Sequence, residues 1–466
     1  MNQPLLETSA LTMASGRAIH DPATGDLIGH APEHTVADLD AAVAVATAVQ
    51  PAWEAAGHGE RSRLLKAAAD AIDEQAETLA HLLSRETGKP LNGPNARLEV
   101  AQSSAWLRAT AEFDTPGEVL VDDGQAYATL AYEAVGVVGA IGPWNWPLMI
   151  TIWQIAPSLR MGNTVVVKPS EYSPLSVLAL GEILNSVLPE GVLQVVSGGR
   201  EVGARISEHE DIAKVMFTGS TRTGKAIAAA GAANLKRLTL ELGGNDAAIV
   251  LDDCDPEVIA EDLFWGAFIN TGQTCAAIKR IYVADNIHDE VAEALAAIAR
   301  DVPMGPGLDE NNVLGPLQNR QQYDIVTRLV DAAREGGARI LVGGDPAEGP
   351  GNFYPATIVA DIAPDNPLVV EEQFGPALPI IRYSDLDQAV AWANGLDVGL
   401  GASVWSADRD RALEVAKRVK AGTVWINSHA VPDPRIPFGG IKQSGYGLEF
   451  GAEGLKSVAV PKVYNG

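Results

Sequence analysis

The stretch KVMFTGSTRTGKAIAAA, residues 214 to 230, places an apolar run, a glycine turn and an alanine-rich segment in immediate succession. This pattern predicts a strand that ends near Gly219 and a helix that begins near Gly224. Glycines at such a turn let the backbone approach a pyrophosphate, and the helix N-terminus supplies oriented N–H groups. Because the spacing is GxxxxG rather than GxGxxG, an ordinary strand-to-helix turn explains this stretch alone at least as well.

The alternation of short strands and helices continues on both sides of this stretch. Upstream, β-branched runs occupy residues 135–141, 164–168 and 193–197, and an amphipathic helix is predicted over 173–188. Apolar strands that alternate with helices are typical of a parallel, doubly wound sheet. A second alternation follows Glu241 and predicts a second α/β domain, with strands at 246–251, 280–284, 338–344, 378–383, 401–406 and 422–427.

Two segments do not follow this alternation. Residues 37–112 are rich in alanine and their charges leave one apolar face, which predicts amphipathic helices. Residues 116–134 alternate as an antiparallel hairpin would. Since this hairpin stands between two larger blocks, we expect it to be an oligomerisation arm.

The composition restricts the classes of function. With 466 residues, of which 47% are hydrophobic and 20% charged, the chain is expected to form a globular enzyme of two or three domains. The formal net charge of -26 argues against a nucleic-acid partner and against an anionic membrane surface, because both would repel the chain. Two cysteines cannot form a disulfide framework, and without CxxC or HExxH we expect no metal site.

We expect a cytoplasmic protein. Residues 1–22 lack the basic region and apolar core of a signal peptide. Residues 134–159 carry no charge and are long enough to suggest a membrane span. However, Pro143 and Pro147 interrupt any helix there, so we predict a buried strand, a loop and a buried helix instead.

Two charged residues follow the strand at 164–168. Lys168 ends that strand and Glu171 lies three residues later. A carboxylate at this end of a strand holds the adenosine ribose hydroxyls in dinucleotide folds, and a nearby lysine shares that contact. A surface salt bridge explains the pair equally well in isolation, but together with the glycine turn at 219–224 it favours a dinucleotide.

Three residues have the chemistry for aldehyde oxidation. Asn145 lies in GPWNWP, where two prolines and two tryptophans make a rigid apolar loop in which an amide suits an oxyanion, although it would also cap its own turn. Glu241, before Gly243-Gly244, is a candidate general base or an ordinary solvated glutamate. Cys275, in GQTC, becomes a good nucleophile where a pocket, base or cation favours its thiolate, whereas Cys254 has no expected role.

Seven motifs, PWNWP, KPSE, FTGST, ELGGN, GQTC, EEQFGP and PFGGIKQSG, stand in the order and spacing of the aldehyde dehydrogenase superfamily. The chain resembles this family over essentially its whole length, and most closely a bacterial group of NAD(P)-dependent, hydrolytic enzymes with broad aldehyde range. The resemblance implies an α/β fold with a Rossmann-like cofactor domain (residues 1–115 and 135–244), a catalytic α/β domain (245–446) and a small β oligomerisation arm (116–134 and 447–466). It also implies a homodimer or homotetramer.

The resemblance also implies roles for individual residues. Cys275 would be the nucleophile that forms a thiohemiacetal and then a thioester, Glu241 the base and Asn145 the oxyanion donor. The cofactor would be held by Lys168, Glu171, Trp144, Gly203, Gly219, Ser220, Glu372 and Phe374. Glu171 would repel a 2′-phosphate, which favours NAD while NADP stays possible.

The chain departs from many relatives near the oxyanion motif. Gln154 stands where those relatives carry a lysine that relays protons with a glutamate near the C-terminus. In this chain we expect the matching position near Glu453 and Gly454.

The expected substrate is a medium-chain aliphatic or aromatic aldehyde, because the pocket should be lined by Trp146, Met149, Trp153, Phe268, Ile269 and Phe438, with Ala276 and residues 427–438. A semialdehyde such as succinic semialdehyde is the alternative if Arg435 turns inward. A CoA-acylating relative is a further alternative, which Glu241 disfavours. An inactive structural relative is another, and the presence of all the catalytic residues argues against it.

Overall fold

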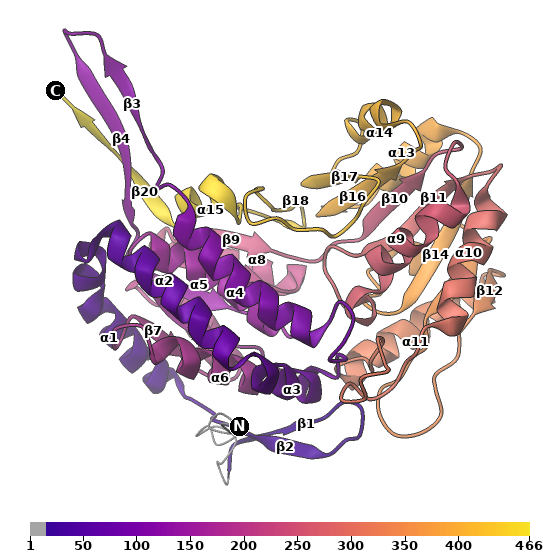
Figure 1. Ribbon diagram of the computed structural model, residues 1–466, viewed down its shortest axis with the longest axis horizontal. Helices are drawn as coiled ribbons and strands as arrows, with labels where there is room; N and C mark the ends of the chain where they lie inside the picture. Colours follow the sequence, from indigo (N-terminus) through magenta and orange to yellow (C-terminus); the bar gives the residue numbers. More distant parts are fainter. Residues whose placement is uncertain (1–14) are drawn as a thin grey trace.

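The computed structural model describes residues 15–466, so the first 14 residues of the predicted cofactor domain and most of the segment tested for a signal peptide lie outside the described residues. Within residues 15–466 the chain forms two α/β units and a projecting β arm (Figure 1). A two-stranded ribbon, β1 (Arg17–His20) with β2 (Leu27–Ala31), lies near the start.

The first unit is built on a sheet with the strand order β19-β9-β8-β5-β6-β7. Its strands are parallel except for β19, which pairs antiparallel with β9. From β5 the chain adds β6 and then β7 on one side, and it then crosses to the other side of β5 to add β8 and β9. This change of direction is the doubly wound arrangement that the sequence predicts. The bounds are β5 (Val137–Ile141), β6 (Thr164–Lys168), β7 (Leu193–Val195), β8 (Ile212–Thr218), β9 (Arg237–Glu241) and β19 (Gly445–Tyr446).

Alternate residues of these strands serve two separate cores. Val165 and Val167 of β6 pack into one hydrophobic cluster, whereas Val166 between them packs into the other. The first cluster is covered by α2 (Gly57–Glu74), α3 (Ala76–Thr87), α4 (Ala96–Glu112), α5 (Pro147–Arg160) and α6 (Pro174–Asn185). The second is covered by α1 (Val36–Ala55), α7 (Arg200–Glu208) and α8 (Thr221–Gly231).

The second unit contains a sheet in the order β12-β13-β14-β11-β10-β16-β17, parallel except for the β12–β13 pair. Its strands are β10 (Asp246–Val250), β11 (Ile278–Ala284), β12 (Arg339–Val342), β13 (Thr357–Ala360), β14 (Ala377–Tyr383), β16 (Gly401–Trp405) and β17 (Thr423–Ile426). Its helices are α9 (Pro256–Phe268), α10 (His288–Asp301), α11 (Arg320–Glu335), α12 (Pro367–Val370), α13 (Leu386–Asn394) and α14 (Arg409–Ala416). A short ribbon of β15 (Val398–Gly399) and β18 (Ile441–Lys442) lies beside this unit's junction with the first.

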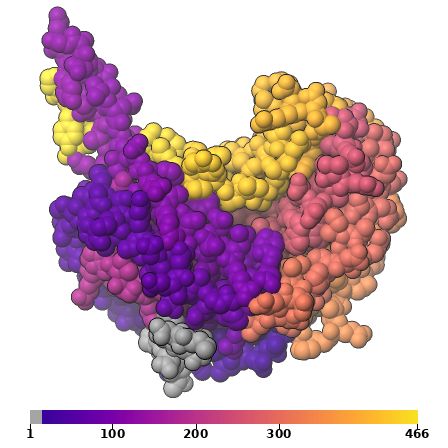
Figure 2. All heavy atoms as spheres, in the orientation of Figure 1, coloured from indigo at the N-terminus to yellow at the C-terminus, as the bar shows by residue number. Residues whose placement is uncertain are grey.

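The predicted hairpin forms the arm, which stands clear of the rest of the molecule (Figures 1 and 2). β3 (Gly117–Asp122) pairs antiparallel with β4 (Tyr127–Ala134), and β20 (Ala459–Asn465) adds to the other edge of β4. The C-terminal segment contributes less to the arm than the predicted 447–466, because α15 (Gly451–Ser457) and Phe450 pack against the first unit.

The uncharged segment 134–159 folds as predicted, into β5, a loop and α5, and every residue of α5 is buried. Across residues 15–466, none of the helices combines the length and the apolar character that crossing a membrane requires.

Candidate active site

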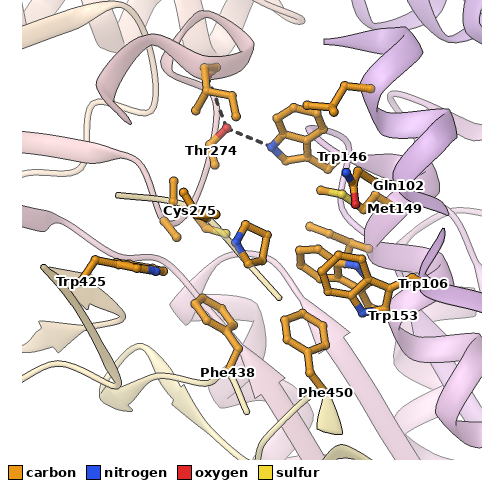
Figure 3. A pocket seen from close by; sticks show the side chains of 17 residues that line it. Gln102, Trp106, Trp146, Met149, Trp153, Thr274, Cys275, Trp425, Phe438 and Phe450 are labelled. Atoms are coloured by element: carbon orange, nitrogen blue, oxygen red, sulfur yellow. Dashed lines mark hydrogen bonds between the residues drawn. The ribbon is translucent and has the colours of Figure 1, made fainter. Parts of the chain in front are cut away.

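Cys275 lies in a cavity of about 250 Å³ between the two α/β units (Figure 3). It follows a 3₁₀ turn, η3 (Ile269–Gly272), that leaves α9 and leads into β11. Asn270, Thr271 and Gly272 all have left-handed backbone conformations, with φ of 50°, 56° and 74°. A Cβ on Gly272 would lie 2.4 Å from the Gly375 oxygen, so only glycine fits there. Three such residues in succession are strained, and the surrounding contacts must hold them.

Asn145 is one of those contacts. Its Nδ2 donates to the Gln273 oxygen at 2.9 Å, two residues before the cysteine. Its own carbonyl accepts from Lys89 Nζ at 2.7 Å and from Asn270 Nδ2 at 2.9 Å. The amide therefore bridges to the cysteine loop rather than capping its own turn, and the second hydrogen of its nitrogen remains for another acceptor.

A buried ion pair fixes the loop that carries Asn145. Lys89 Nζ lies 2.5 Å from Glu99 Oε2, and both side chains are inaccessible to solvent. Glu99 Oε1 accepts from the backbone N–H groups of Leu148 and Met149, in the first turn of α5. The Lys89 ammonium also lies 3.9 Å above the ring of Trp146. Neither charged residue was selected from the sequence.

Glu241, the last residue of β9, is buried, and its carboxylate oxygens have no side-chain hydrogen-bond partner within residues 15–466, although the nearby backbone N–H of Gly440 lowers its pKa slightly. Burial raises its pKa well above 4.5, and the nearby Glu449 carboxyl raises the pKa further. A higher pKa makes the Glu241 carboxylate a stronger proton acceptor, which suits a general base. The solvated-glutamate interpretation is therefore wrong.

Glu449, and not Glu453, is the acid that accompanies Glu241. Glu453 pairs with Lys456 on α15 at 2.8 Å, with its side chain 46% exposed. Glu449 is buried and its backbone forms an isolated antiparallel bridge with Phe438, and burial raises the pKa of Glu449. Lys214 lowers the Glu449 pKa, while burial brings the pKa of Lys214 itself to about 7.

Gln154 lies in the same interior. Its Nε2 donates to Thr218 Oγ1 at 3.3 Å, and its Oε1 has no partner among the described residues. Thr218 is the strand neighbour of Glu241. The position therefore holds a neutral amide near the acid pair, and Lys214 is a buried cation that acts on Glu449.

The walls of the cavity are apolar and aromatic (Figure 3). Five of the six residues selected from the sequence line it, Trp146, Met149, Trp153, Ile269 and Phe438, as does Ala276. Phe268 does not, because its ring stacks on Phe264 at 4.5 Å in the core of the second unit. The residues that the sequence did not indicate are Leu98, Gln102, Trp106, Ile150, Trp425 and Phe450.

Arg435 is not part of the wall. Its side chain is 78% exposed and pairs with Asp433 at 2.5 Å.

Thr274 is held by Trp146, whose Nε1 donates to the threonine hydroxyl at 2.9 Å. The polar side chains of the wall are therefore Gln102, Thr274 and Cys275.

A second group of predicted residues lies at the carboxyl ends of the first sheet. Lys168 is buried, and its Nζ bonds only the adjacent Pro169 oxygen among the described residues. Gly203 on α7 faces its stem, where a Cβ would lie 3.5 Å from Lys168 Cδ. Glu171 pairs with Arg17 at 3.1 Å, a contact that the sequence did not predict.

The glycine turn has the expected form. The backbone N–H of Gly219 donates to the backbone carbonyl oxygen of Glu241 at 3.0 Å. A Cβ at Gly219 would clash with the ring of Phe217. Ser220 is exposed and caps α8 by accepting from Thr223 N. The free N-terminus of α8 therefore faces outward beside the strand ends, where it suits a phosphate.

Glu372, Phe374 and Trp144 connect this group to the cavity. Glu372 Oε1 accepts from Gly244 N at 3.1 Å, and a Cβ on Gly243 would lie 2.6 Å from its other oxygen. The Gly-Gly pair therefore makes room for Glu372. Burial raises the pKa of Glu372 to about 7. The rings of Phe374 and Trp144 meet edge to face at 5.4 Å.

Comparison with known proteins assigns this arrangement to a family. Residues 12–464 match the Aldehyde dehydrogenase family. The chain belongs to this family. It is similar to the phenylacetaldehyde dehydrogenase of Pseudomonas fluorescens, with 39% identity over 94% of this chain and 90% of the relative.

Solved structures of similar proteins agree. A structure of PnpE, a protein of Pseudomonas sp. WBC-3, in complex with nicotinamide adenine dinucleotide is 37% identical, with a TM-score of 0.93 over 96% of this chain and 93% of that one. A structure described as an E. coli NADP dependent enzyme is 33% identical, with a TM-score of 0.94 over 97% and 94% of the two chains. This chain is accordingly an NAD(P)-dependent aldehyde dehydrogenase that oxidises an aldehyde to the acid.

The residues of this aldehyde dehydrogenase fit a dinucleotide. The glycines allow close approach: a Cβ would meet Phe217 at Gly219 and Glu372 at Gly243, and would only touch the Lys168 stem at Gly203. Lys168 offers buried donors with a single protein partner, which suits ribose hydroxyls. Lys168 ends β6, and Gly219 and the N-terminus of α8 follow β8, so they lie at the strand ends where such folds bind nucleotides.

Proposed function

We propose that this aldehyde dehydrogenase oxidises medium-chain aliphatic or aromatic aldehydes by a cysteine thiohemiacetal and thioester, and releases the acid by hydrolysis. The observation that supports this most directly is the position of Cys275 in the wall of an apolar cavity, close enough to the buried carboxyl of Glu241 for that carboxyl to affect the pKa of the thiol.

In the proposed reaction the Cys275 sulfur bonds to the aldehyde carbon, and the carbonyl oxygen becomes an oxyanion. The unused N–H of Asn145 donates to that oxyanion. A nicotinamide cofactor held by Glu372 and Phe374 would supply the hydride acceptor, and loss of the hydride from the carbon would leave a thioester on Cys275. Glu241 then takes a proton from water as the water attacks the thioester carbon, and the C–S bond breaks to give the acid and the free cysteine.

The rest of the first unit supports these steps. Lys89 and Glu99 hold the Asn145 loop. Glu449 raises the pKa of Glu241, which makes the Glu241 carboxylate a stronger base toward water. Lys168, Glu171, Gly203, Gly219, Ser220 and Trp144 would hold the dinucleotide, and Glu372 and Phe374 its nicotinamide half.

The substrate class follows from the cavity lining. Trp106, Trp153 and Phe450 form a cluster with ring centroids 4.7 to 5.3 Å apart, and Phe438 stacks on Phe450 at 6.0 Å. Burying a hydrocarbon tail against these rings gains about 25 cal/mol per Å². A carboxylate in the same place would lose its hydration without a cation, because Arg435 faces away. A semialdehyde is therefore the weaker candidate.

The cofactor preference depends on Glu171. Its carboxylate suits the ribose hydroxyls of NAD and repels a 2′-phosphate. The Arg17 guanidinium at 3.1 Å offsets part of that repulsion. We therefore propose NAD as the preferred cofactor, with NADP accepted.

The arm suits self-association into a homodimer or homotetramer. Val119, Leu120 and Val121 of β3 and Val463 and Tyr464 of β20 are exposed on a narrow three-stranded sheet. An exposed apolar sheet edge is usually covered by a partner. We propose a second copy of the chain as that partner, in a cytoplasmic enzyme.

The test is absorbance of reduced nicotinamide when the purified enzyme is mixed with NAD or NADP and hexanal, benzaldehyde or succinic semialdehyde. Hexanal or benzaldehyde should be turned over far better than the semialdehyde. Cys275→Ala should abolish turnover and keep cofactor binding, whereas the matched control Cys254→Ala should retain activity. Preference for the semialdehyde would refute the apolar pocket, and a CoA thioester product would refute the hydrolytic ending.

A further inference from the structure

A buried lysine, Lys279 at the start of β11, lies directly behind the cysteine loop. Its side chain is only 1% exposed. Its Nζ donates to the Thr274 oxygen at 2.6 Å and to the Gly272 oxygen at 3.0 Å. These two carbonyls flank the last turn before Cys275, so one ammonium group fastens the strained segment that carries the thiol.

Among the described residues no carboxylate forms an ion pair with this ammonium, and burial lowers the pKa of Lys279. Its Nζ lies 5.1 Å from the centre of the Phe374 ring, an attractive distance for a cation. Both of its hydrogen-bond partners are neutral carbonyls, and burying a charge without an opposite charge is costly. The negative charges that act on it are those of Glu372, Asp246 and a deprotonated Cys275.

Carboxylates surround the thiol on the other sides. The groups that face Cys275 and Lys279 are Glu241 at the end of β9, Asp246 in β10 and Glu372 after α12, with His429 3.5 Å beyond Asp246. Burial is the largest cause that raises the pKa of Cys275, to about 12, and the three carboxylates raise it further. The charge of Lys279 acts in the opposite direction and lowers the pKa of the thiol. A thiolate among three acids needs a cation, and Lys279 is the buried one.

We propose that the Lys279 ammonium is the positioning residue that compensates the negative charge of the Cys275 thiolate while it holds the Gly272 and Thr274 carbonyls. This role depends on Cys275 being the nucleophile of the proposed function and adds to it the charge that makes that nucleophile available. Lys279 touches neither the substrate nor the reacting bonds, and acts through the cysteine.

The test is the rate at which iodoacetamide alkylates Cys275 in the full-length enzyme, without aldehyde, followed by mass spectrometry of the Cys275 peptide across pH 6 to 10. In this reaction the sulfur–carbon bond forms and iodide leaves, so below the thiol pKa the rate follows the thiolate fraction. The reagent is uncharged, and the buried Cys254 peptide serves as an internal reference.

Lys279→Gln keeps donor groups for the two carbonyls but removes the charge. It should slow alkylation at fixed pH about tenfold or more, because a neighbouring opposite charge shifts a pKa by about one to three units. Lys279→Arg keeps the charge and should stay near the wild-type rate. An unchanged rate in the Gln variant would overturn the proposal, as would an equal loss in both variants, because that would mean loop placement alone.

If Lys279→Gln fails to fold, the comparison moves to Asp246→Asn, which removes a neighbouring carboxylate while its Oδ1 still accepts from Gly401 N. Adding Lys279→Gln to that variant should again slow alkylation, and equal rates would overturn the proposal. Alkylation needs no turnover, so an enzyme that fails on every aldehyde but shows this pattern would refute the proposed function, while the charge effect of Lys279 on the thiol would still be measured.

Discussion

The buried pair of Lys89 and Glu99 offers a prediction that separates stability from catalysis. Lys89→Met removes the ammonium and leaves the Glu99 carboxylate buried, with the N–H groups of Leu148 and Met149 as its remaining partners. Breaking a fully buried ion pair by removing one partner costs about 3 to 5 kcal/mol of unfolding free energy. We expect a loss of this size in chemical denaturation.

The same change also loosens the Asn145 loop. The Asn145 carbonyl loses its 2.7 Å bond from Lys89, and Trp146 loses the cation above its ring. Because removal of a single oxyanion donor costs about a hundredfold to a thousandfold in kcat, a misplaced Asn145 should lower kcat by up to about a hundredfold. The steady-state rate of NAD reduction, measured well below the unfolding temperature, gives this number.

The matched control is the double variant Lys89→Met with Glu99→Gln. Its Gln oxygen still accepts from the first turn of α5 and no charge is buried, so most of the lost stability should return. The kcat should stay low, because the bond to Asn145 is still missing. A folded Lys89→Met enzyme with wild-type kcat would refute the reasoning that this pair positions the oxyanion donor.

Three further predictions concern other parts of the enzyme. Glu449→Gln removes a carboxyl that raises the pKa of Glu241. Since Glu241 is inactive as a base while protonated, the acidic limb of the kcat–pH profile should move to lower pH. An unmoved limb would mean that the two acids do not interact. Arg17→Ala leaves Glu171 without its counter-charge, so the ratio of kcat/KM for NADP to that for NAD should fall in parallel assays, and a rise would show that Arg17 opposes the 2′-phosphate. Val463→Asp places a charge on the exposed face of β20, and sedimentation should show a smaller assembly than the wild type with an unchanged far-UV spectrum; wild-type association would exclude this face as the contact.

The sheets were the easiest part to predict, because their strands are short apolar runs between helices. β6 coincides with the predicted residues 164–168, whereas β13 (Thr357–Ala360) was missed, since four residues after a proline are too few to show a pattern. The fold class and the placement of Cys275, Glu241 and Asn145 near one another were accessible from motifs.

The rest of the site depends on long-range contacts. Phe268 and Ile269 are neighbours, yet the turn at η3 directs the first into the core and the second into the cavity. Glu449 and Glu453 both lie in the glycine-containing tail, and only the pairing of Glu449 with Phe438 shows which one is buried. Trp106 comes from a helix distant in the chain, and nothing local distinguishes it from an ordinary core residue.

The order in which the arm is made has a consequence for synthesis of the protein. Lys462 of β20 contacts Glu133 of β4, 329 residues earlier. At a translation rate of about 5 to 20 residues per second, the β3–β4 hairpin emerges roughly 15 to 65 seconds before its third strand. During that interval the open edge of β4 has no partner within its own chain, and neighbouring nascent chains on one message present the same edge. The hairpin is therefore exposed to wrong pairing during synthesis, and crowded translation increases that exposure.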